Sequence, residues 1–154
     1  MKDIKTTCEC GRTHIKLHAA PRVRFRCHCT KCQAVYGAHY ADALLFRRGQ
    51  VRAEEPDSLK WIKTMRPSPL SRGVCRHCDQ PMLGLLFGVF NIVPSDRLSD
   101  LALPPVSCDI YYGTRVRDLA DNIPKHLGAV ASYVGLTLPV MQVLALPGKR
   151  LPQN

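Results

Sequence analysis

The densest group of reactive side chains in this sequence is the six-residue stretch CHCTKC, which carries the thiols of Cys27, Cys29 and Cys32. On a strand, side chains two residues apart point to the same side, so Cys27 and Cys29 share a face. A turn after Cys29 can bring Cys32 back to the same point. Three converging sulfur atoms suit a zinc ion, and three protein ligands leave one position open, as in catalytic zinc sites. We therefore predict an active-site zinc at this stretch.

Four further cysteines form two short pairs, CEC at Cys8 and Cys10 and CRHC at Cys75 and Cys78. Together they offer four sulfur atoms, the set that a closed structural zinc site needs. Joining the pairs would close a loop of about 65 residues and so remove much of the conformational entropy of the unfolded chain. We predict a structural zinc ion here, which makes two zinc ions per chain.

Three other residues could add to this chemistry. His39 follows the CHCTKC stretch by seven residues; it could move a proton or fill the open zinc position, although a surface histidine is the commoner role. His28 lies between two predicted ligands and is expected to point to the opposite, outward face. Cys108 stands alone and is expected to be a small buried apolar side chain, with zinc ligation as the alternative.

The chain is basic, with 22 Lys and Arg against 12 Asp and Glu and a formal charge of +10. Such a surface favours nucleic acid, acidic lipid, or a small ligand rich in carboxylates. Nucleic acid is the less expected partner, because the few aromatic residues do not alternate with basic ones as stacking platforms require. Some basic residues near the cysteines could bind carboxylates, or form a solvated strand face; these are Arg22, Arg24, Arg26, Lys31 and Arg72.

The pattern of apolar residues predicts a mainly β domain of short antiparallel strands with a few short helical turns. Alternation of apolar and polar residues indicates half-buried strands over 12–19 and 22–27. Thr30 can cap a short helical turn that Gly37 ends. Similar patterns predict further strands at 38–46, at 59–65, at 80–93 (two strands or one bent strand) and at 106–112.

The segment 127–147 carries no charged residue, and basic residues follow it. It is nearly long enough to span a bilayer, but polar residues and prolines dilute it, and Gly128 and Gly135 weaken any helix. We expect the 127–154 tail to pack on the zinc-binding domain of residues 1–126, or against a second subunit in a homodimer. The polar start shows no signal-peptide pattern, so we expect a cytoplasmic protein whose paired cysteines bind metal.

The order of the cysteine motifs resembles a known family. CxCG near the start, then CHCTKCQ, then CRHCDQP, is similar to the glutathione-dependent formaldehyde-activating enzyme family, whose β-tent fold is shared with centromere protein V. The stretch SCDIYYGTRVRDLADNIP resembles that family's closing strand, so the resemblance covers about Thr6 to Pro124. It implies a structural zinc and an active-site zinc, held by Cys8, Cys10, Cys75 and Cys78 and by Cys27, Cys29 and Cys32. After Cys78 the family usually has glycine, whereas this chain has Asp79 and Gln80.

The resemblance implies a zinc-dependent carbon-sulfur lyase-type enzyme, which joins glutathione and formaldehyde to S-hydroxymethylglutathione or acts on a related thiol–aldehyde adduct. The partners would be a small aldehyde and a small thiol, with glutathione as co-substrate. The open zinc would lower the pKa of that thiol and so favour a thiolate that attacks the aldehyde. Two alternatives stay open: a zinc-stabilised module that binds nucleic acid or protein, and a metal-free redox site in which the three thiols form a disulfide.

Overall fold

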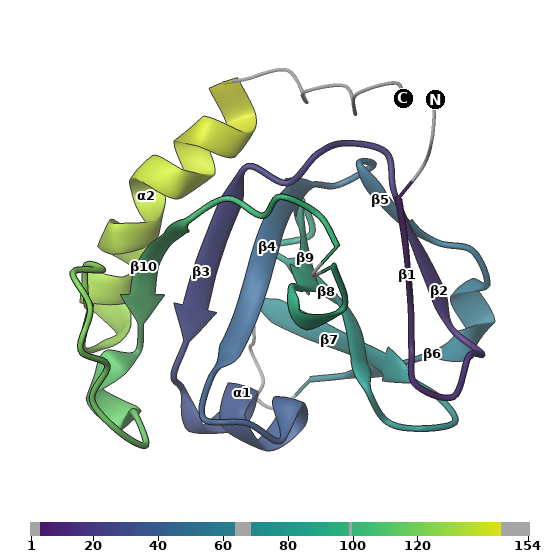
Figure 1. Ribbon diagram of the computed structural model, residues 1–154, viewed down its shortest axis with the longest axis horizontal. Coiled ribbons are helices and arrows are strands. Elements are labelled where there is room, and N and C mark those ends of the chain that lie inside the picture. Colours follow the sequence, from purple (N-terminus) through teal and green to yellow (C-terminus); the bar gives the residue numbers. More distant parts are fainter. Residues whose placement is uncertain (1–3, 64–68, 99, 146–154) are drawn as a thin grey trace.

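The computed structural model describes residues 4–63, 69–98 and 100–145, and it is mainly β, as predicted. Three strands form a small sheet: β1 (Ile4–Thr7), β2 (His14–Leu17) and β5 (Val51–Ala53). Seven form a larger one: β3 (Val23–Cys27), β4 (Ala41–Arg47), β6 (Leu59–Ile62), β7 (Leu70–Cys75), β8 (Pro81–Leu86), β9 (Phe90–Pro94) and β10 (Val106–Ile110). The strand orders are β1-β2-β5 and β10-β3-β4-β9-β8-β7-β6 (Figure 1).

The strands pair antiparallel with one exception among the described residues, the parallel pair of β3 and β10. The predicted strands at 12–19 and 22–27 correspond to β2 and β3, and their apolar residues are buried. Residues 80–93 form two strands, not one bent strand. They turn at Phe87 and Gly88, whose φ angles of 50° and 71° lie in the left-handed region.

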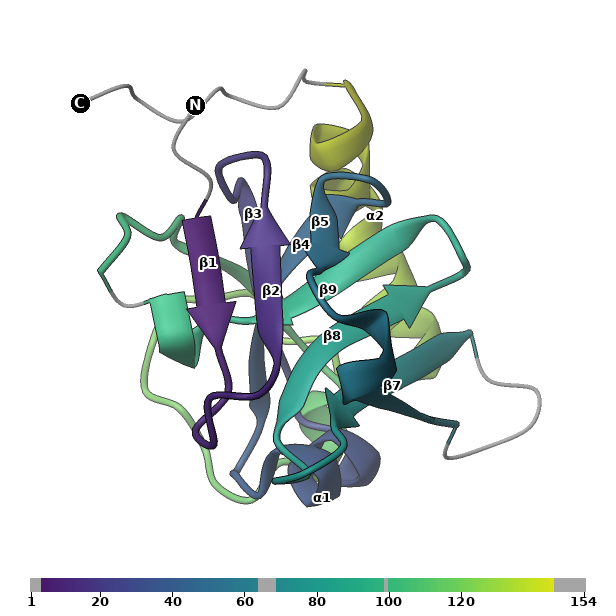
Figure 2. The ribbon, with the colours of Figure 1, turned by 90° about the vertical axis from the view of Figure 1, so that its right-hand side faces the viewer.

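Strand β4 is central to the packing because both of its faces are buried. Successive side chains of a strand point to opposite faces. Leu44 and Phe46 therefore join one apolar cluster, between the larger sheet and the small sheet, whereas Ala43 and Leu45 join a second cluster on the other face. Figure 2 shows the small sheet lying across the larger one. The strand thus separates two cores.

Each core contains part of one cysteine group. Cys8 and Cys75 belong to the cluster between the sheets, and Cys27 and Cys32 belong to the cluster on the opposite face of β4. Both predicted metal sites are therefore built into apolar packing, and each one is supported by a different core.

Helix α1 (Thr30–Tyr36) follows β3 and ends, as predicted, at Gly37, whose φ of 59° is left-handed. The residue that caps its start is Cys29 and not Thr30. The Cys29 sulfur accepts a hydrogen bond of 3.3 Å from the backbone N–H of Cys32. The prediction of Thr30 as the cap was wrong by one residue, because a cysteine sulfur serves as the acceptor in place of the usual hydroxyl.

The segment after residue 127 forms a second helix, α2 (Ala129–Ala145), which the sequence did not predict. It packs along β10, β3 and β4, and its buried residues recur every three or four positions, at Ser132, Leu136, Pro139 and Val143 (Figure 1). Gly135 is a packing residue here, because an added Cβ would lie 2.3 Å from the His126 ring. Burial of one face outweighs the weak helix propensity of glycine.

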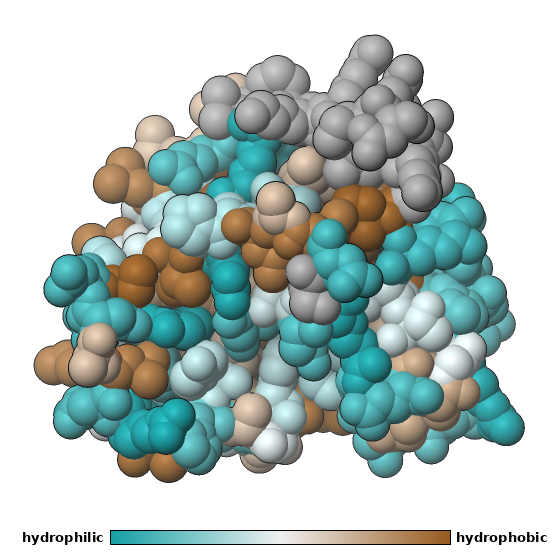
Figure 3. Space-filling model, in the orientation of Figure 1, coloured by the Kyte–Doolittle hydropathy of each residue, from teal (hydrophilic) through white to brown (hydrophobic). Residues whose placement is uncertain are grey.

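The outer side of α2 remains apolar. Exposed apolar side chains of the helix are Val130, Val134, Leu138, Met141 and Leu144, and Leu127 precedes them. Figure 3 shows brown surface on the left side of the molecule, where Figure 1 places α2. Within the described residues, no helix combines the length and the hydrophobicity that a membrane crossing requires.

A buried polar network lies beside β3. Asp109 in β10 has no exposed side-chain surface; it accepts two hydrogen bonds of 2.7 Å from Arg26, and its Oδ1 lies 2.7 Å from Nε2 of His28. The prediction that His28 faces outward was wrong: only 1% of it is exposed, and its ring lies 5.0 Å from the rings of Tyr40 and Tyr112. The parallel β10 strand and the segment after it cover this face, which the sequence pattern left open.

We predict that Asp109→Ala destabilises the fold by about 3–5 kcal/mol, because it leaves the guanidinium of Arg26 and the ring of His28 buried with one partner fewer. Asp118→Ala is the matched control, since this exposed carboxylate pairs with Arg115 at the surface and should matter little. Urea unfolding of both variants gives the free energies. Equal losses for the two variants would contradict the role assigned to Asp109.

Candidate functional site

The two N-terminal cysteines and the CRHC pair come together in space. The four sulfur atoms of Cys8, Cys10, Cys75 and Cys78 lie within 4.8 Å of one another. The Cys8–Cys10 distance is 3.4 Å, and Cys75 lies 3.6 Å from each of them. A tetrahedral zinc with sulfur ligands at about 2.3 Å requires sulfur atoms roughly 3.8 Å apart. The donor set and its spacing therefore fit a closed zinc site.

Backbone N–H groups point at these sulfur atoms. Thr13 donates to Cys8 over 3.2 Å, and His77 donates to Cys75 over 3.5 Å. Although burial raises the pKa of Cys75, hydrogen bonds from Thr13 and from the N–H groups of His77 and Cys78 lower it to about 6. Such donors stabilise thiolates, the form in which cysteine binds metal.

The turn after Cys78 forms although this chain has Asp79 and Gln80 where the resembled family usually has glycine. Asp79 adopts a left-handed φ of 57°, which explains why glycine is usual there, and aspartate is one of the few other residues that tolerate it. Its N–H donates to the Cys75 carbonyl over 2.9 Å. Gln80 adds a link that the sequence did not reveal, because its Oε1 accepts a 2.7 Å hydrogen bond from the N–H of Glu9 in the other turn.

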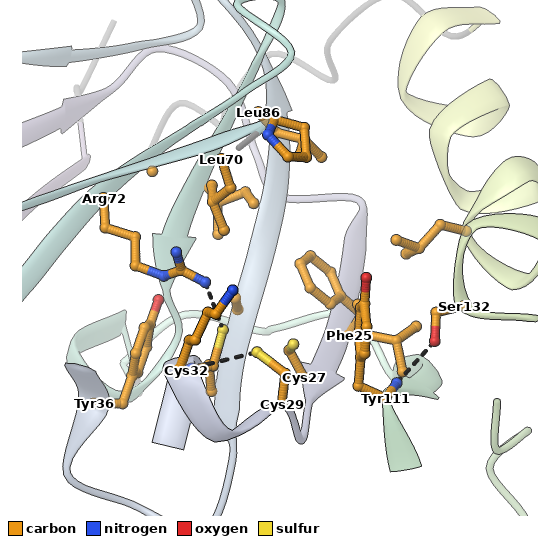
Figure 4. Close-up of a pocket in the computed structure, with 18 of the residues that line it drawn as sticks. Phe25, Cys27, Cys29, Cys32, Tyr36, Leu70, Arg72, Leu86, Tyr111 and Ser132 are labelled. Atoms are coloured by element: carbon orange, nitrogen blue, oxygen red, sulfur yellow. Dashed lines mark hydrogen bonds between the residues drawn. The ribbon is translucent and has the colours of Figure 1, made fainter. Parts of the chain in front are cut away.

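The second group lies at one end of a cavity. The sulfur atoms of Cys27, Cys29 and Cys32 lie within 4.8 Å of one another, where β3 runs into α1. They form part of the wall of a cavity of about 370 Å³ (Figure 4). The described residues bring no fourth sulfur, histidine or carboxylate to this group. The arrangement fits a zinc ion with an open position facing the cavity.

Arg72 in β7 is the charged partner of this group. It is 8% exposed, and its Nη2 donates to the Cys32 sulfur over 3.3 Å (Figure 4). The pKa of Cys29 lies well below its usual value, because Cys27 and Cys32 donate hydrogen bonds to its sulfur and Arg72 adds positive charge. Burial lowers the pKa of Arg72, but the bond to Cys32 and the thiolate charge more than offset this effect. The site therefore favours a thiolate at Cys29, whereas the pKa values of Cys27 and Cys32, which donate hydrogen bonds to it, are raised.

The cavity is lined by two cations, several hydroxyl groups and many apolar side chains. Among the described lining residues, Lys31 and Arg72 are the charged ones, and no carboxylate joins them. Tyr36 and Tyr111 bring hydroxyl groups, and burial raises the pKa of each, that of Tyr111 to about 12. Much of the remaining wall is apolar; this part includes Phe25, Leu70, Leu83, Leu86, Ile92 and Leu136.

The other basic candidates of the sequence lie elsewhere. Arg24 and Arg26 point to the face of β3 opposite the cysteines, and neither forms a solvated face, because they are bound by Asp42 and by Asp109 with Asp121. Arg22 is likewise outside the residues that line the cavity. The alternation of β3 fixes this outcome, since even-numbered residues there cannot reach the side of Cys27.

Two remaining candidates also lie outside the cavity wall. His39 is exposed and is not among the residues that line the cavity. Cys108 is 2% exposed within the same apolar cluster as Cys27, and burial raises its pKa to about 11, as expected for a small apolar core residue. It does not join either sulfur group of the described chain.

Two comparisons with known proteins give matches. A family model described as glutathione-dependent formaldehyde-activating enzyme matches residues 3–91, a range that holds all seven clustered cysteines. A crystal structure of a Rhodobacter sphaeroides protein, determined as a structural genomics target, shares the fold with a TM-score of 0.55 at 20% identity; the alignment covers 79% of this chain and 99% of that one. No curated protein gives a significant match. Because the family model spans more than half of the sequence, this chain belongs to the glutathione-dependent formaldehyde-activating enzyme family.

Proposed function

We propose that this protein is a zinc-dependent carbon-sulfur lyase-type enzyme that joins a thiol, with glutathione as the first candidate, to formaldehyde or a related aldehyde. One observation carries the proposal: in a member of this family, three thiols and a buried arginine form one end of a cavity of about 370 Å³. Of the two sulfur groups found among the described residues, this is the one that lines the cavity.

Two zinc ions fit the two sulfur groups. Cys8, Cys10, Cys75 and Cys78 would hold a structural ion, and Cys27, Cys29 and Cys32 an active-site ion. When bound at the second group, zinc supplies positive charge and an open coordination position, which lower the pKa of an incoming thiol.

The residues of the chain would support the addition as follows. Arg72 and Lys31 favour negative charge at the sulfur end of the cavity and can attract a carboxylate of the thiol. The thiolate sulfur bonds to the carbonyl carbon, the carbon–oxygen π bond breaks, and the oxygen takes up the proton that the thiol lost. Tyr36 keeps its proton because burial raises its pKa, so its Oη can donate a hydrogen bond to that oxygen. No oxidant or reductant is needed.

The two sites should differ in their response to loss of a ligand. Cys78→Ser should leave little folded protein, because the four-cysteine site joins turns far apart in sequence and its metal-binding energy is folding energy, on the order of 10 kcal/mol. Cys29→Ser should give a folded protein with about one zinc per chain and no activity. Zinc per chain, circular dichroism and thermal melting of both variants, beside the wild-type protein with two zinc ions, test this.

A mild chelator should likewise remove one zinc ion first, together with the activity, while the chain stays folded. If Cys29→Ser unfolds the chain and Cys78→Ser leaves it stable, the structural and active sites are assigned the wrong way round. A protein without zinc, whose three thiols form a disulfide, would support a redox site instead.

Replacing Arg72 by glutamine should lower kcat/KM for glutathione and formaldehyde roughly tenfold to hundredfold, because a charged hydrogen bond to sulfur is worth about 1.5–3 kcal/mol. Arg76→Gln is the matched control, four residues along the chain and outside the cavity, where it binds backbone carbonyls. NMR measures the rate of exchange between free glutathione and its formaldehyde adduct, and the rate with enzyme minus the uncatalysed rate gives kcat/KM. Equal activity of the two variants would show that Arg72 plays no part in the reaction.

A further inference from the structure

The cavity is much larger than the smallest aldehyde requires. Its volume of about 370 Å³ is roughly twelve times the liquid volume of a water molecule. Formaldehyde has a single carbon and a single oxygen atom, and it would occupy only the space next to the sulfur atoms. Most of the cavity is therefore left for another part of the bound molecule.

Most of that remaining space is lined by apolar side chains, and Tyr111, Ser132 and Tyr133 add hydroxyl groups to its wall. Leu70 and Leu86 lie away from the cysteines, and the ring of Phe25 lies between β3 and this end of the cavity (Figure 4). Of the two lining cations, Arg72 contacts the sulfur of Cys32, and Lys31 belongs to α1, the helix that carries Cys32. The carboxylates of glutathione therefore match the sulfur end, and the far end matches a hydrocarbon group.

Helix α2 forms part of the cavity wall, although it lies beyond the part of the chain that the family model matches. Leu136 is 8% exposed and lines the cavity. The helix is held in place by Ser132, whose Oγ accepts a 2.8 Å hydrogen bond from the N–H of Tyr111, and by Arg47, whose Nε donates to the Val143 carbonyl over 2.8 Å. The wall that α2 forms is thus fixed to the sheet by specific contacts.

We propose that the apolar part of the cavity, which α2 helps to line, holds the hydrocarbon substituent of an aldehyde larger than formaldehyde, bound as its adduct with a thiol. This rests on the function proposed above and names the substrate class: adducts of the form R–S–CH(OH)–R′ in which R′ is an alkyl or aryl group. Their formation and cleavage follow the balance already given, with one carbon–sulfur bond made or broken and one proton moved between sulfur and oxygen.

The test uses two stable probes, S-hexylglutathione and S-methylglutathione, with the zinc-loaded full chain and calorimetry. The hexyl probe should bind at least tenfold more tightly, because its additional methylene groups enter the apolar end. Leu136→Trp and Leu86→Trp should each remove this preference by filling the cavity, and the second variant serves if the first does not fold. Leu138→Trp is the matched control, since 71% of Leu138 is exposed on the outer side of α2.

Turnover supplies the second readout. With glutathione, hexanal should give at least a tenfold higher kcat/KM than formaldehyde. Leu136→Trp should lower the ratio of these two values at least tenfold, whereas Leu138→Trp should leave the ratio unchanged. Equal binding of the two probes, with formaldehyde still turned over, would overturn the larger substrate and leave the proposed function standing. Preferential binding of the hexyl probe without turnover of any aldehyde would overturn the lyase function and leave only an apolar ligand site, so the two failures can be told apart.

Discussion

The architecture depends on the contact between two turns that meet through sulfur. One turn follows β1 and carries Cys8 and Cys10, and the other follows β7 and carries Cys75 and Cys78. The small sheet shares no strand pairing with the larger one among the described residues, so their association rests on an apolar cluster, on this contact and on hydrogen bonds between the adjoining loops. Four sulfur atoms within 4.8 Å would repel one another as thiolates. A zinc ion bound among them would compensate these negative charges and hold the two turns together.

Strand β4 separates the two cysteine groups, which pack in cores on its opposite faces. Side chains of this strand are buried on both faces. One face packs in the core that contains Cys8 and Cys75 of the four-cysteine group, and the other face packs in the core that contains Cys27 and Cys32, which line the cavity. Strands β8 and β9 contribute to both sides, because Met82, Leu83 and Val93 belong to the cluster between the sheets while Leu83 and Ile92 line the cavity. The same separation explains why Arg26, close in sequence to Cys27, belongs to the Asp109 network and not to the cavity.

The sequence was most informative where chemistry and spacing act together. Seven cysteines in three short motifs predicted both sulfur groups, and the alternation of Val23, Phe25 and Cys27 predicted the face of β3 that carries one of them. Local patterns could not reveal long-range contacts. The burial of His28 depends on β10, which pairs with β3 from 83 residues further along the chain at Asp109 and Arg26, and the helical state of α2 depends on the sheet beneath it.

Local sequence patterns also could not identify Arg72 as the basic residue that contacts the cysteines. In sequence it was one of five basic candidates, and only the register of β7 against its neighbours brings its guanidinium to Cys32. The apolar end of the cavity was equally hidden, since its wall is assembled from β3, β7, β8, β9 and α2. Ligand shape is set by these distant elements, whereas metal chemistry is set by local motifs.

The central claim is that one sulfur group is closed and the other is open to a thiol. Zinc-edge X-ray absorption of the protein, before and after addition of glutathione, tests it most directly. A closed four-sulfur site beside an open three-sulfur site predicts a mean of about 3.5 sulfur ligands per zinc, rising to about 4 when glutathione sulfur fills the open position. A mean that stays unchanged under saturating glutathione, or a spectrum without zinc–sulfur scattering, would contradict the account.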